Sequence, residues 1–225
     1  QTLKDYLRNR TYALEVQALQ PVGESAVPSG KNKAQASIVD PVDPEVVRSQ
    51  IGGLEDKALF QAGDYRAYLI EEKDAPDAMR EIYRLREETF RLIGEGTGKP
   101  VDTDAYDGYY KHLILWNIPN GEIVGAYRVG YGSEIIPRLG KEGLYTSSLV
   151  RFGPLADKIL PHGMELGRSF ISPEYQKEAL PLKLMLAGLA VAMARDPEST
   201  CCTGTVSISD RLPNLFKSLA VCFLE

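Results

Sequence analysis

The sequence predicts a mixed α/β domain, and three observations carry that prediction. Short apolar segments typical of strands occupy residues 64–71, 112–117, 122–131, 165–171 and 203–209. Longer segments with helical composition or periodicity occupy residues 44–54, 74–93, 173–195 and 212–224. Asn120-Gly121 is a strong hairpin signal between two of the strands. Strands and helices in this order indicate a sheet with helices packed on it.

The N-terminal part differs in composition from the rest. Residues 1–19 have weak helical amphipathicity, and residues 20–44 are rich in Pro, Gly, Ser, Ala and Lys. We therefore expect residues 1–60 to form a helix and flexible linker ahead of a domain at residues 61–225. Asp43-Pro44-Glu45 supplies an N-cap, a proline at the first helical position and an acidic first turn, which predicts the next helix.

The helix at residues 173–195 is expected to begin after Ser172 as its N-cap. Its Leu, Met and Ala content predicts that it is largely buried.

The totals exclude several classes of protein. A net charge of -5 and a pI near 5.3 argue against a general nucleic-acid binder. Three cysteines and two histidines indicate neither a disulfide framework nor a metal site, so we expect reduced thiols in a cytoplasmic protein. No apolar segment approaches the length of a membrane span, and no signal peptide is visible. Because the chain begins with Gln1, a fragment is expected.

Four charged residues interrupt apolar elements: Arg86, Arg128, Glu165 and Arg168. Arg86 lies in the middle of the apolar stripe of the 74–93 helix, where a charge needs a partner or a ligand. The four side chains are expected to converge, either as a catalytic or substrate-binding centre or as a structural ion-pair network. Glu165 and Arg168 are three apart, so they share one side of a strand only if that strand is bulged.

Two loops are ambiguous from the sequence alone. Asp102, Asp104 and Asp107 are candidates for binding a cation or an amine, with a solvated loop or helix cap as the alternative. The glycine-rich loop at residues 94–100 follows a helix and lacks the P-loop pattern, which favours a mobile cover over a phosphate site. His112 opens a strand and is expected to be structural.

The order of these motifs resembles one branch of the GNAT superfamily. The matching residues are Arg86-x-x-x-Phe90, Asp104-x-x-Asp107, His112-Leu113, Val124-Gly-Ala-Tyr-Arg128 and Glu165-Leu-Gly-Arg168-Ser169. The branch contains the acyl-homoserine-lactone synthases and the ornithine- and glycine-lipid N-acyltransferases of bacteria, whose members are often labelled hemolysins. The match covers about residues 61–225 and implies a mixed, mostly antiparallel sheet flanked by helices, with a bulged fourth strand. It also implies that the C-terminal part is incomplete. Residues 1–60 resemble the linker after a lysophospholipid acyltransferase domain.

Tyr127-Arg128 and Glu165-Leu-Gly-Arg168 are closest in pattern to the amino-acid lipid synthases. This resemblance implies transfer of a long, often 3-hydroxylated acyl chain from acyl carrier protein to an amino-acid amine. The donor is then a phosphopantetheine thioester, and no cofactor is bound tightly. Acyl-CoA is the alternative donor, although Tyr175-Gln-Lys-Glu-Ala-Leu-Pro181 stands where the GNAT pyrophosphate loop is expected.

The resemblance also assigns roles to residues. The expected catalytic residues are Glu165, Arg168 and Arg128. Glu165 would accept the amine proton, and one of the two arginines would hold the acceptor's carboxylate. The expected substrate-binding residues are Arg86, Phe90, Asp104, Asp107 and Ser169, with Arg86 holding Glu165 or lining the donor channel.

Partners and rival functions remain open at this point. Arg80, Arg84 and Arg91 are candidates for docking an acidic carrier protein, and a solvated helix face is the alternative. Rival functions are an acyl-CoA-dependent GNAT enzyme acting on another amine and a non-catalytic GNAT-like module in which an ion pair locks Glu165. A pore-forming protein is disfavoured, while peripheral membrane contact is compatible with a lipid product.

Overall fold

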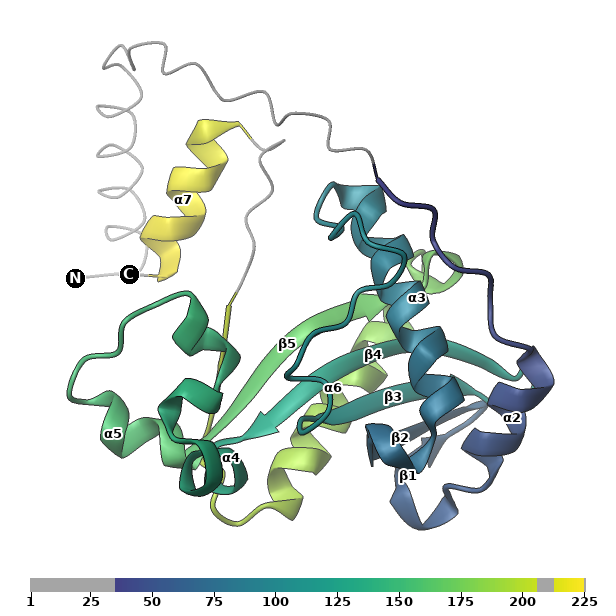
Figure 1. Cartoon of the computed structure of the whole chain (residues 1–225), viewed down its shortest axis with the longest axis horizontal. Coiled ribbons are helices and arrows are strands. Elements are labelled where there is room, and N and C mark those ends of the chain that lie inside the picture. The colour runs from purple at the N-terminus through teal and green to yellow at the C-terminus, as the bar shows by residue number, and fades with distance from the viewer. Residues whose placement is uncertain (1–34, 206–212, 225) are drawn as a thin grey trace, which may run out of the picture. The chain divides into compact units, whose positions relative to one another are not determined.

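The computed structural model describes residues 35–205 and 213–224, and its centre is one sheet of six strands (Figure 1). The strands lie in sequence order and are β1 (Ala58–Ala62), β2 (Tyr65–Glu71), β3 (Lys111–Asn117), β4 (Glu122–Tyr131), β5 (Gly163–Ile171) and β6 (Cys201–Gly204). Neighbours from β1 to β5 are antiparallel, and β5 pairs with β6 in parallel. The predicted mixed, mostly antiparallel sheet is confirmed.

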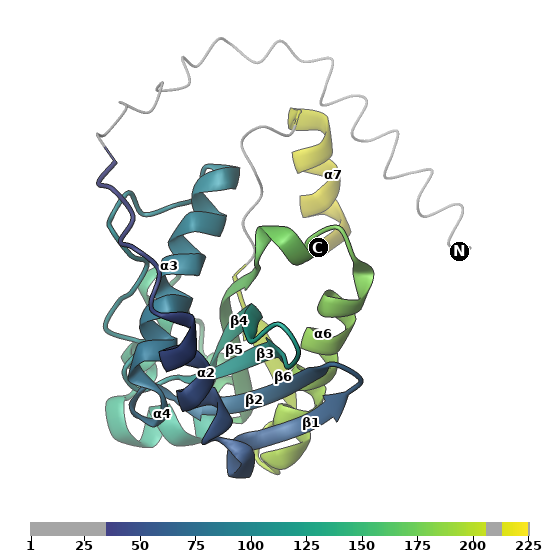
Figure 2. The same cartoon turned by 90° about the vertical axis from the view of Figure 1, so that its right-hand side faces the viewer.

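Helices cover both faces of the sheet, with α3 (Pro76–Ile93) on one side and α6 (Ala179–Arg195) on the other (Figure 2). Alternation along β3 supplies both interfaces, because successive side chains in a strand point to opposite faces. Ile114 and Trp116 pack in the core on the α3 side, whereas Leu113 and Leu115 pack in the core on the α6 side.

The segment before α3 contains an element that the sequence predicted well. In α2 (Pro44–Gly52) the Asp43 side chain accepts a hydrogen bond from the Glu45 backbone N–H, and Pro44 takes the first helical position. Residues 35–43 have no regular structure, and two of their N–H groups donate to carbonyls of the 98–100 loop. The predicted helix at residues 1–19 and most of the predicted linker lie outside the described residues, so the boundary near residue 60 stays a prediction.

The connection from β4 to β5 was not predicted. It contains two helices, α4 (Gly132–Leu139) and α5 (Ala156–Ile159), and three 3-10 turns, η3 (Lys141–Gly143), η4 (Tyr145–Ser148) and η5 (Leu160–His162). Strand β1 was also missed, as were the short turns η1 (Glu55–Lys57) and η2 (Glu72–Asp74). These elements are too short for a hydrophobic period to develop.

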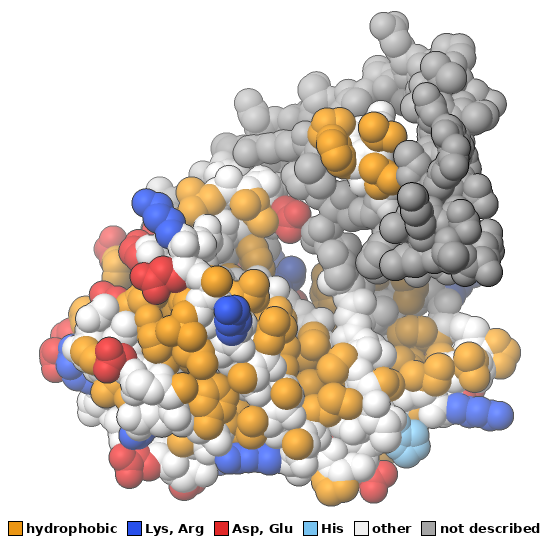
Figure 3. All heavy atoms as spheres, turned by 180° about the vertical axis from the view of Figure 1, so that it is seen from behind, with side chains coloured by type: hydrophobic (Ala, Val, Ile, Leu, Met, Phe, Trp, Pro, Cys, Tyr) orange, Lys and Arg blue, Asp and Glu red, His pale blue; other side chains and the backbone are white. Residues whose placement is uncertain are grey.

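The long helix after β5 begins later than expected. A 3-10 turn, η6 (Pro173–Tyr175), comes first, and α6 starts at Ala179. The prediction that Ser172 caps the helix is wrong, because its hydroxyl donates instead to the Ile123 carbonyl at 3.0 Å. The helix is also less buried than expected: Leu182 and Leu186 are about half exposed, and a broad apolar area covers this side of the molecule (Figure 3).

The C-terminal elements are described in part. Strand β6 begins two residues before the predicted strand at 203–209, most of which lies outside the described residues. The helix α7 (Asn214–Leu224) agrees with the predicted final helix and belongs to a second compact unit. Within the described parts of the chain, no helix is long and apolar enough to cross a membrane, and no group of metal-ligating side chains is found.

Candidate active site

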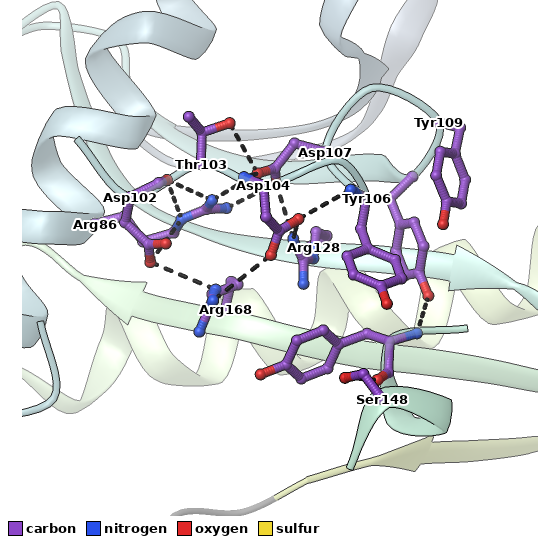
Figure 4. Close-up of polar contacts among 12 residues, drawn as sticks. Arg86, Asp102, Thr103, Asp104, Tyr106, Asp107, Tyr109, Arg128, Ser148 and Arg168 are labelled. Atoms are coloured by element: carbon purple, nitrogen blue, oxygen red, sulfur yellow. Dashed lines mark hydrogen bonds and ion pairs between the residues drawn. The ribbon is translucent and has the colours of Figure 1, made fainter. Parts of the chain in front are cut away.

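Three arginines and three aspartates meet on the side of the sheet that α3 covers (Figure 4). Arg86 comes from α3, Arg128 from β4 and Arg168 from β5, while Asp102, Asp104 and Asp107 come from the loop that leads into β3. We call these six residues the Arg–Asp cluster. Equal numbers of opposite charges allow the cluster to be buried without an uncompensated net charge.

Arg86 is held by Asp107 rather than by Glu165. Its guanidinium donates to both Asp107 carboxylate oxygens, at 3.1 and 2.9 Å, and its Nε donates to the Asp102 carbonyl at 3.1 Å. Burial raises the pKa of the Asp107 carboxyl, but the hydrogen bonds and charge of Arg86 and the charge of Arg128 outweigh it and lower the pKa to about 2. The expectation that Arg86 orients Glu165 is therefore wrong, although its prediction as a buried charge with a partner is confirmed.

Arg128 is equally buried and has a hydrogen-bonding group left over. One nitrogen, Nη1, donates to Asp104 at 2.5 Å and to Asp107 at 3.3 Å. The other, Nη2, is buried and has no hydrogen-bond partner among the described residues. The guanidinium carbon lies 5.2 to 5.5 Å from the ring centres of Tyr106, Tyr110 and Tyr145. An unpaired donor in such a place is costly unless a ligand satisfies it.

Arg168 lies on a bulge of β5. Ala126 pairs with Phe170 and Arg128 pairs with Gly167, so two residues of β5, Arg168 and Ser169, stand opposite one residue of β4. Arg168 has φ of 49°, and no other residue except glycine has a positive φ in the described part of the chain. Its guanidinium lies 3.4 Å from Asp102 and 3.6 Å from Asp104. The bulge that the family resemblance implied is confirmed.

Glu165 is buried and is surrounded by hydrogen-bond donors. The Tyr110 hydroxyl, the Thr146 hydroxyl and the backbone N–H groups of Tyr145 and Thr146 all donate to its carboxylate, the last two at 2.9 Å. No ion pair involves Glu165 among the described residues. Burial, followed by the hydrogen bond to Glu165, raises the pKa of the Tyr110 hydroxyl, which stays protonated as a donor. Gly130 makes room for Tyr110, because a Cβ at this position would overlap the tyrosine ring.

Two tyrosines connect Glu165 with the Arg–Asp cluster. The Tyr145 ring lies under the guanidinium groups of both Arg128 and Arg168, and its N–H bonds Glu165. Tyr110 contacts Arg128 through its ring and Glu165 through its hydroxyl. The structure thus brings Glu165, Arg128 and Arg168 into one neighbourhood, as the sequence predicted. The sequence reasoning missed Tyr110, Tyr145 and Thr146. The tyrosine-rich run before β3 was a visible signal for Tyr110 alone.

The other predicted residues take different places. Asp104 and Asp107 belong to the Arg–Asp cluster, so neither a solvated loop nor a cation site describes them. Ser169 is exposed on the bulge, whereas Phe90 packs against the core on the α3 side. His112 is buried, and burial lowers the pKa of its imidazole to about 4, which agrees with a neutral structural histidine.

The loop after α3 and the arginines on α3 are paired within the chain. The Glu87 carboxylate accepts hydrogen bonds from Thr97 and Gly98, which ties the glycine-rich loop to the helix. Arg80, Arg84 and Arg91 each form an ion pair with a carboxylate of α3 itself. Such pairs leave less positive charge for a partner than the sequence suggested.

The bulge stands where β5 leaves β6. The parallel pairing runs from Gly163 opposite Cys201 to Leu166 opposite Gly204 and includes no later described residue. Arg168 therefore lies just beyond the last paired position. By contrast, a pocket of about 270 Å³ between α2, α3 and the start of β4 is lined by none of the three cluster arginines and not by Glu165.

Comparison with known proteins agrees with this fold. Residues 85–186 match the model described as the acetyltransferase (GNAT) domain. The comparisons support a GNAT acyltransferase. Two proteins named glycine N(alpha)-acyltransferase, from Phocaeicola vulgatus and Bacteroides thetaiotaomicron, are each 40% identical over 146 residues, which is 62% of this chain. The chain spans 44% and 43% of the length of these relatives. No solved structure matches it.

Proposed function

We propose that this GNAT domain is an N-acyltransferase that moves a long acyl chain from a carrier-protein thioester to an amino-acid amine. One observation carries the proposal: a buried carboxylate, Glu165, and a buried guanidinium with an unused donor, Arg128, both contact the same two tyrosines, Tyr110 and Tyr145. Acyl transfer to an amino acid needs these two groups together, one for the amine proton and one for the carboxylate. The product is an N-acyl amino acid with the properties of a lipid.

The reaction proceeds by direct attack. The neutral amine attacks the thioester carbonyl carbon, the C–N bond forms, the C–S bond breaks and the thiolate leaves with the carrier. Glu165 takes the amine proton, directly or through a water, and for this it exchanges one of its present donors. Backbone N–H groups at the Arg168 bulge are suited to stabilise the oxyanion, because on its β6 side β5 has no paired neighbour there among the described residues.

The acceptor carboxylate fits the arginine pair. Arg128 contributes Nη2, and Arg168, whose side chain is 26% exposed, is the more open of the two. A planar guanidinium binds a carboxylate through two parallel hydrogen bonds. Glycine is the first acceptor to test, because both relatives bear that name. The tyrosine rings around Arg128 leave limited space, which also favours a small amino acid.

The N-terminus of α6 favours a carrier-protein donor over coenzyme A. A helix N-terminus binds a pyrophosphate through free N–H groups and its partial positive charge. Here the carboxylate-bearing Glu178 stands at the N-cap and Pro181 lacks an N–H in the first turn. Both features disfavour binding of an anionic pyrophosphate at the N-terminus of α6. Acyl-CoA used on another amine is the second candidate, supported by the GNAT family match alone.

The test is a mass-spectrometric assay of N-acyl glycine formed from long-chain acyl carrier protein or from acyl-CoA. Glu165→Gln is expected to lower kcat by about a hundredfold or more, the usual contribution of a general base. Glu142→Gln, a change at an exposed glutamate of the same connection, is the matched control and should keep full activity. Undiminished turnover by Glu165→Gln would remove Glu165 as the base. No turnover with any donor, together with measurable glycine binding, would favour a non-catalytic module.

A further inference from the structure

Exposed aliphatic side chains gather at the connection between β4 and β5. They project from three neighbouring segments, the end of α4, the end of η4 and the helix α5, and their exposed fractions reach 64% at Leu155 and 56% at Leu149. Unpaired cations lie among them, with no hydrogen bond or ion pair to any described residue. We call this set the α4–α5 surface: Leu139, Leu149, Val150, Leu155 and Ile159, with Arg138, Arg151 and Lys158.

The charge of this region is opposite to that of the chain. Residues 138–162 contain four lysines and arginines against two acidic residues, whereas the whole chain carries a net charge of -5. One of the two acidic residues, Asp157, is already paired with Lys141. The α4–α5 surface is therefore a cationic and apolar region on an acidic protein, which is suited to an anionic partner.

We propose that the α4–α5 surface docks onto an anionic lipid bilayer. Basic side chains next to exposed aliphatic ones are the combination that binds the interface of such a membrane, where the charges meet lipid headgroups and the aliphatic groups enter the acyl boundary. A bilayer accepts side chains that project separately from different elements. A protein partner requires a shaped, well-packed interface instead.

The place of this surface in the chain supports the same partner. Leu149 follows Thr146 by three residues, and Thr146 donates two hydrogen bonds to Glu165. A membrane at the α4–α5 surface would lie next to the residues that hold the reactive carboxylate. The advantage of this location rests on the proposed function, since a long-chain N-acyl amino acid leaves the enzyme most readily into a bilayer. Apolar side chains and a blue basic group are visible at this end of the unit in Figure 3.

The test is sedimentation of the purified protein with vesicles of phosphatidylglycerol and phosphatidylcholine, at low and high salt. The protein is expected to bind anionic vesicles, and weakly or not at all vesicles of phosphatidylcholine alone. The double change Arg151→Gln with Lys158→Gln should reduce partitioning roughly twenty-five-fold, at about fivefold for each basic residue near the membrane. Leu149→Ser with Leu155→Ser should also reduce it, whereas Leu186→Ser, an exposed leucine of α6, should not.

Three outcomes would overturn the proposal. In the first, the protein does not bind anionic vesicles. In the second, its vesicle binding is unchanged in the α4–α5 variants. In the third, the α4–α5 variants lose binding to an acidic carrier protein but keep binding to vesicles. Acyl transfer from long-chain acyl carrier protein in solution, measured without vesicles, separates this proposal from the proposed function. The α4–α5 variants should keep that activity. A protein that turns over without binding vesicles refutes only the membrane surface. One that binds vesicles through this surface without turnover refutes only the enzyme.

Discussion

The structure predicts that two buried aspartates of the same loop differ sharply in their contribution to stability. Asp107 and Asp102 are both 1% exposed and both lie beside Arg86. The Asp107 carboxylate accepts four side-chain hydrogen bonds and one backbone hydrogen bond, whereas neither Asp102 carboxylate oxygen has a hydrogen-bond partner in the described chain. Asp107→Asn and Asp102→Asn are therefore a matched pair with different expected results.

The magnitude for Asp107 follows from its pKa. A lowering from 3.8 to about 2 corresponds to roughly 2.5 kcal/mol of stability at neutral pH. Asparagine also points an amide N–H₂ toward the guanidinium groups and leaves the buried cations Arg86 and Arg128 without their anionic partner. Removing one partner of a buried ion pair usually lowers stability by about 3–5 kcal/mol. We expect Asp107→Asn to lower the free energy of unfolding by about 3–5 kcal/mol.

Asp102→Asn should cost much less. Burial is the largest influence on the Asp102 carboxyl and raises its pKa, although the charges of Arg86 and Arg168 act in the opposite direction. The ionised form is thus less favourable in the fold than in water, and a neutral side chain removes that penalty. The free energy of unfolding is expected to change by less than about 1 kcal/mol.

Urea unfolding followed by the fluorescence of Trp116, the one tryptophan in the chain, measures both variants. The pH dependence adds a second test. Because the Asp107 pKa is depressed in the fold, its contribution is fully present above about pH 4 and is lost as the pH falls toward about 2. Asp107→Asn should remove this part of the acid sensitivity. Equal destabilisation by the two variants, or a loss below about 1 kcal/mol for Asp107→Asn, would refute the reasoning.

Two further predictions concern the site. Arg128→Lys should raise KM for the amino-acid acceptor at least about tenfold, with a smaller effect on kcat, because lysine lacks the planar guanidinium and the ring stacking of arginine. Steady-state kinetics would measure this change, and an unchanged KM would count against Arg128 as the carboxylate ligand. Gly130→Ala should lower stability by about 1–3 kcal/mol because its Cβ meets the Tyr110 ring. In thermal unfolding, Gly153→Ala, where nothing lies within 4 Å, serves as the control, and equal melting temperatures for the two variants would contradict this explanation.

The sequence identified the charges of the site better than their partners. Arg86 could be identified from the sequence because an arginine in an apolar helical stripe breaks the pattern. Burying such a charge without a partner costs much free energy, so a partner or ligand is expected. Its partner Asp107 lies 21 residues away in a loop that has no period of its own. Local patterns carry no information about which of three nearby aspartates will turn inward, so the network required coordinates.

Glu165 shows a second limit of sequence reasoning. Two of its four donors are backbone N–H groups of η4, and a backbone group has no identity in the sequence. The turn that presents them is four residues long, too short for a periodic signal. Strand β5 was predictable from its apolar residues, but its bulge was not. The spacing of Glu165 and Arg168 shows only that they need an extra residue to share one side, and the bulge itself was implied by the family resemblance.

The bulge and the Arg–Asp cluster stabilise each other. A left-handed backbone at an arginine costs about 1–3 kcal/mol and persists only where surrounding contacts determine it. Arg168 meets that condition, since its guanidinium lies near Asp102 and Asp104 and against the Tyr145 ring. Arg86 and Arg128 also hold the same aspartate loop. The cluster thus fixes the strained residue at the position where β5 leaves β6, near Glu165. This is a physical reason for a protein to place six charges, four of them almost fully buried, beside the proposed reaction centre.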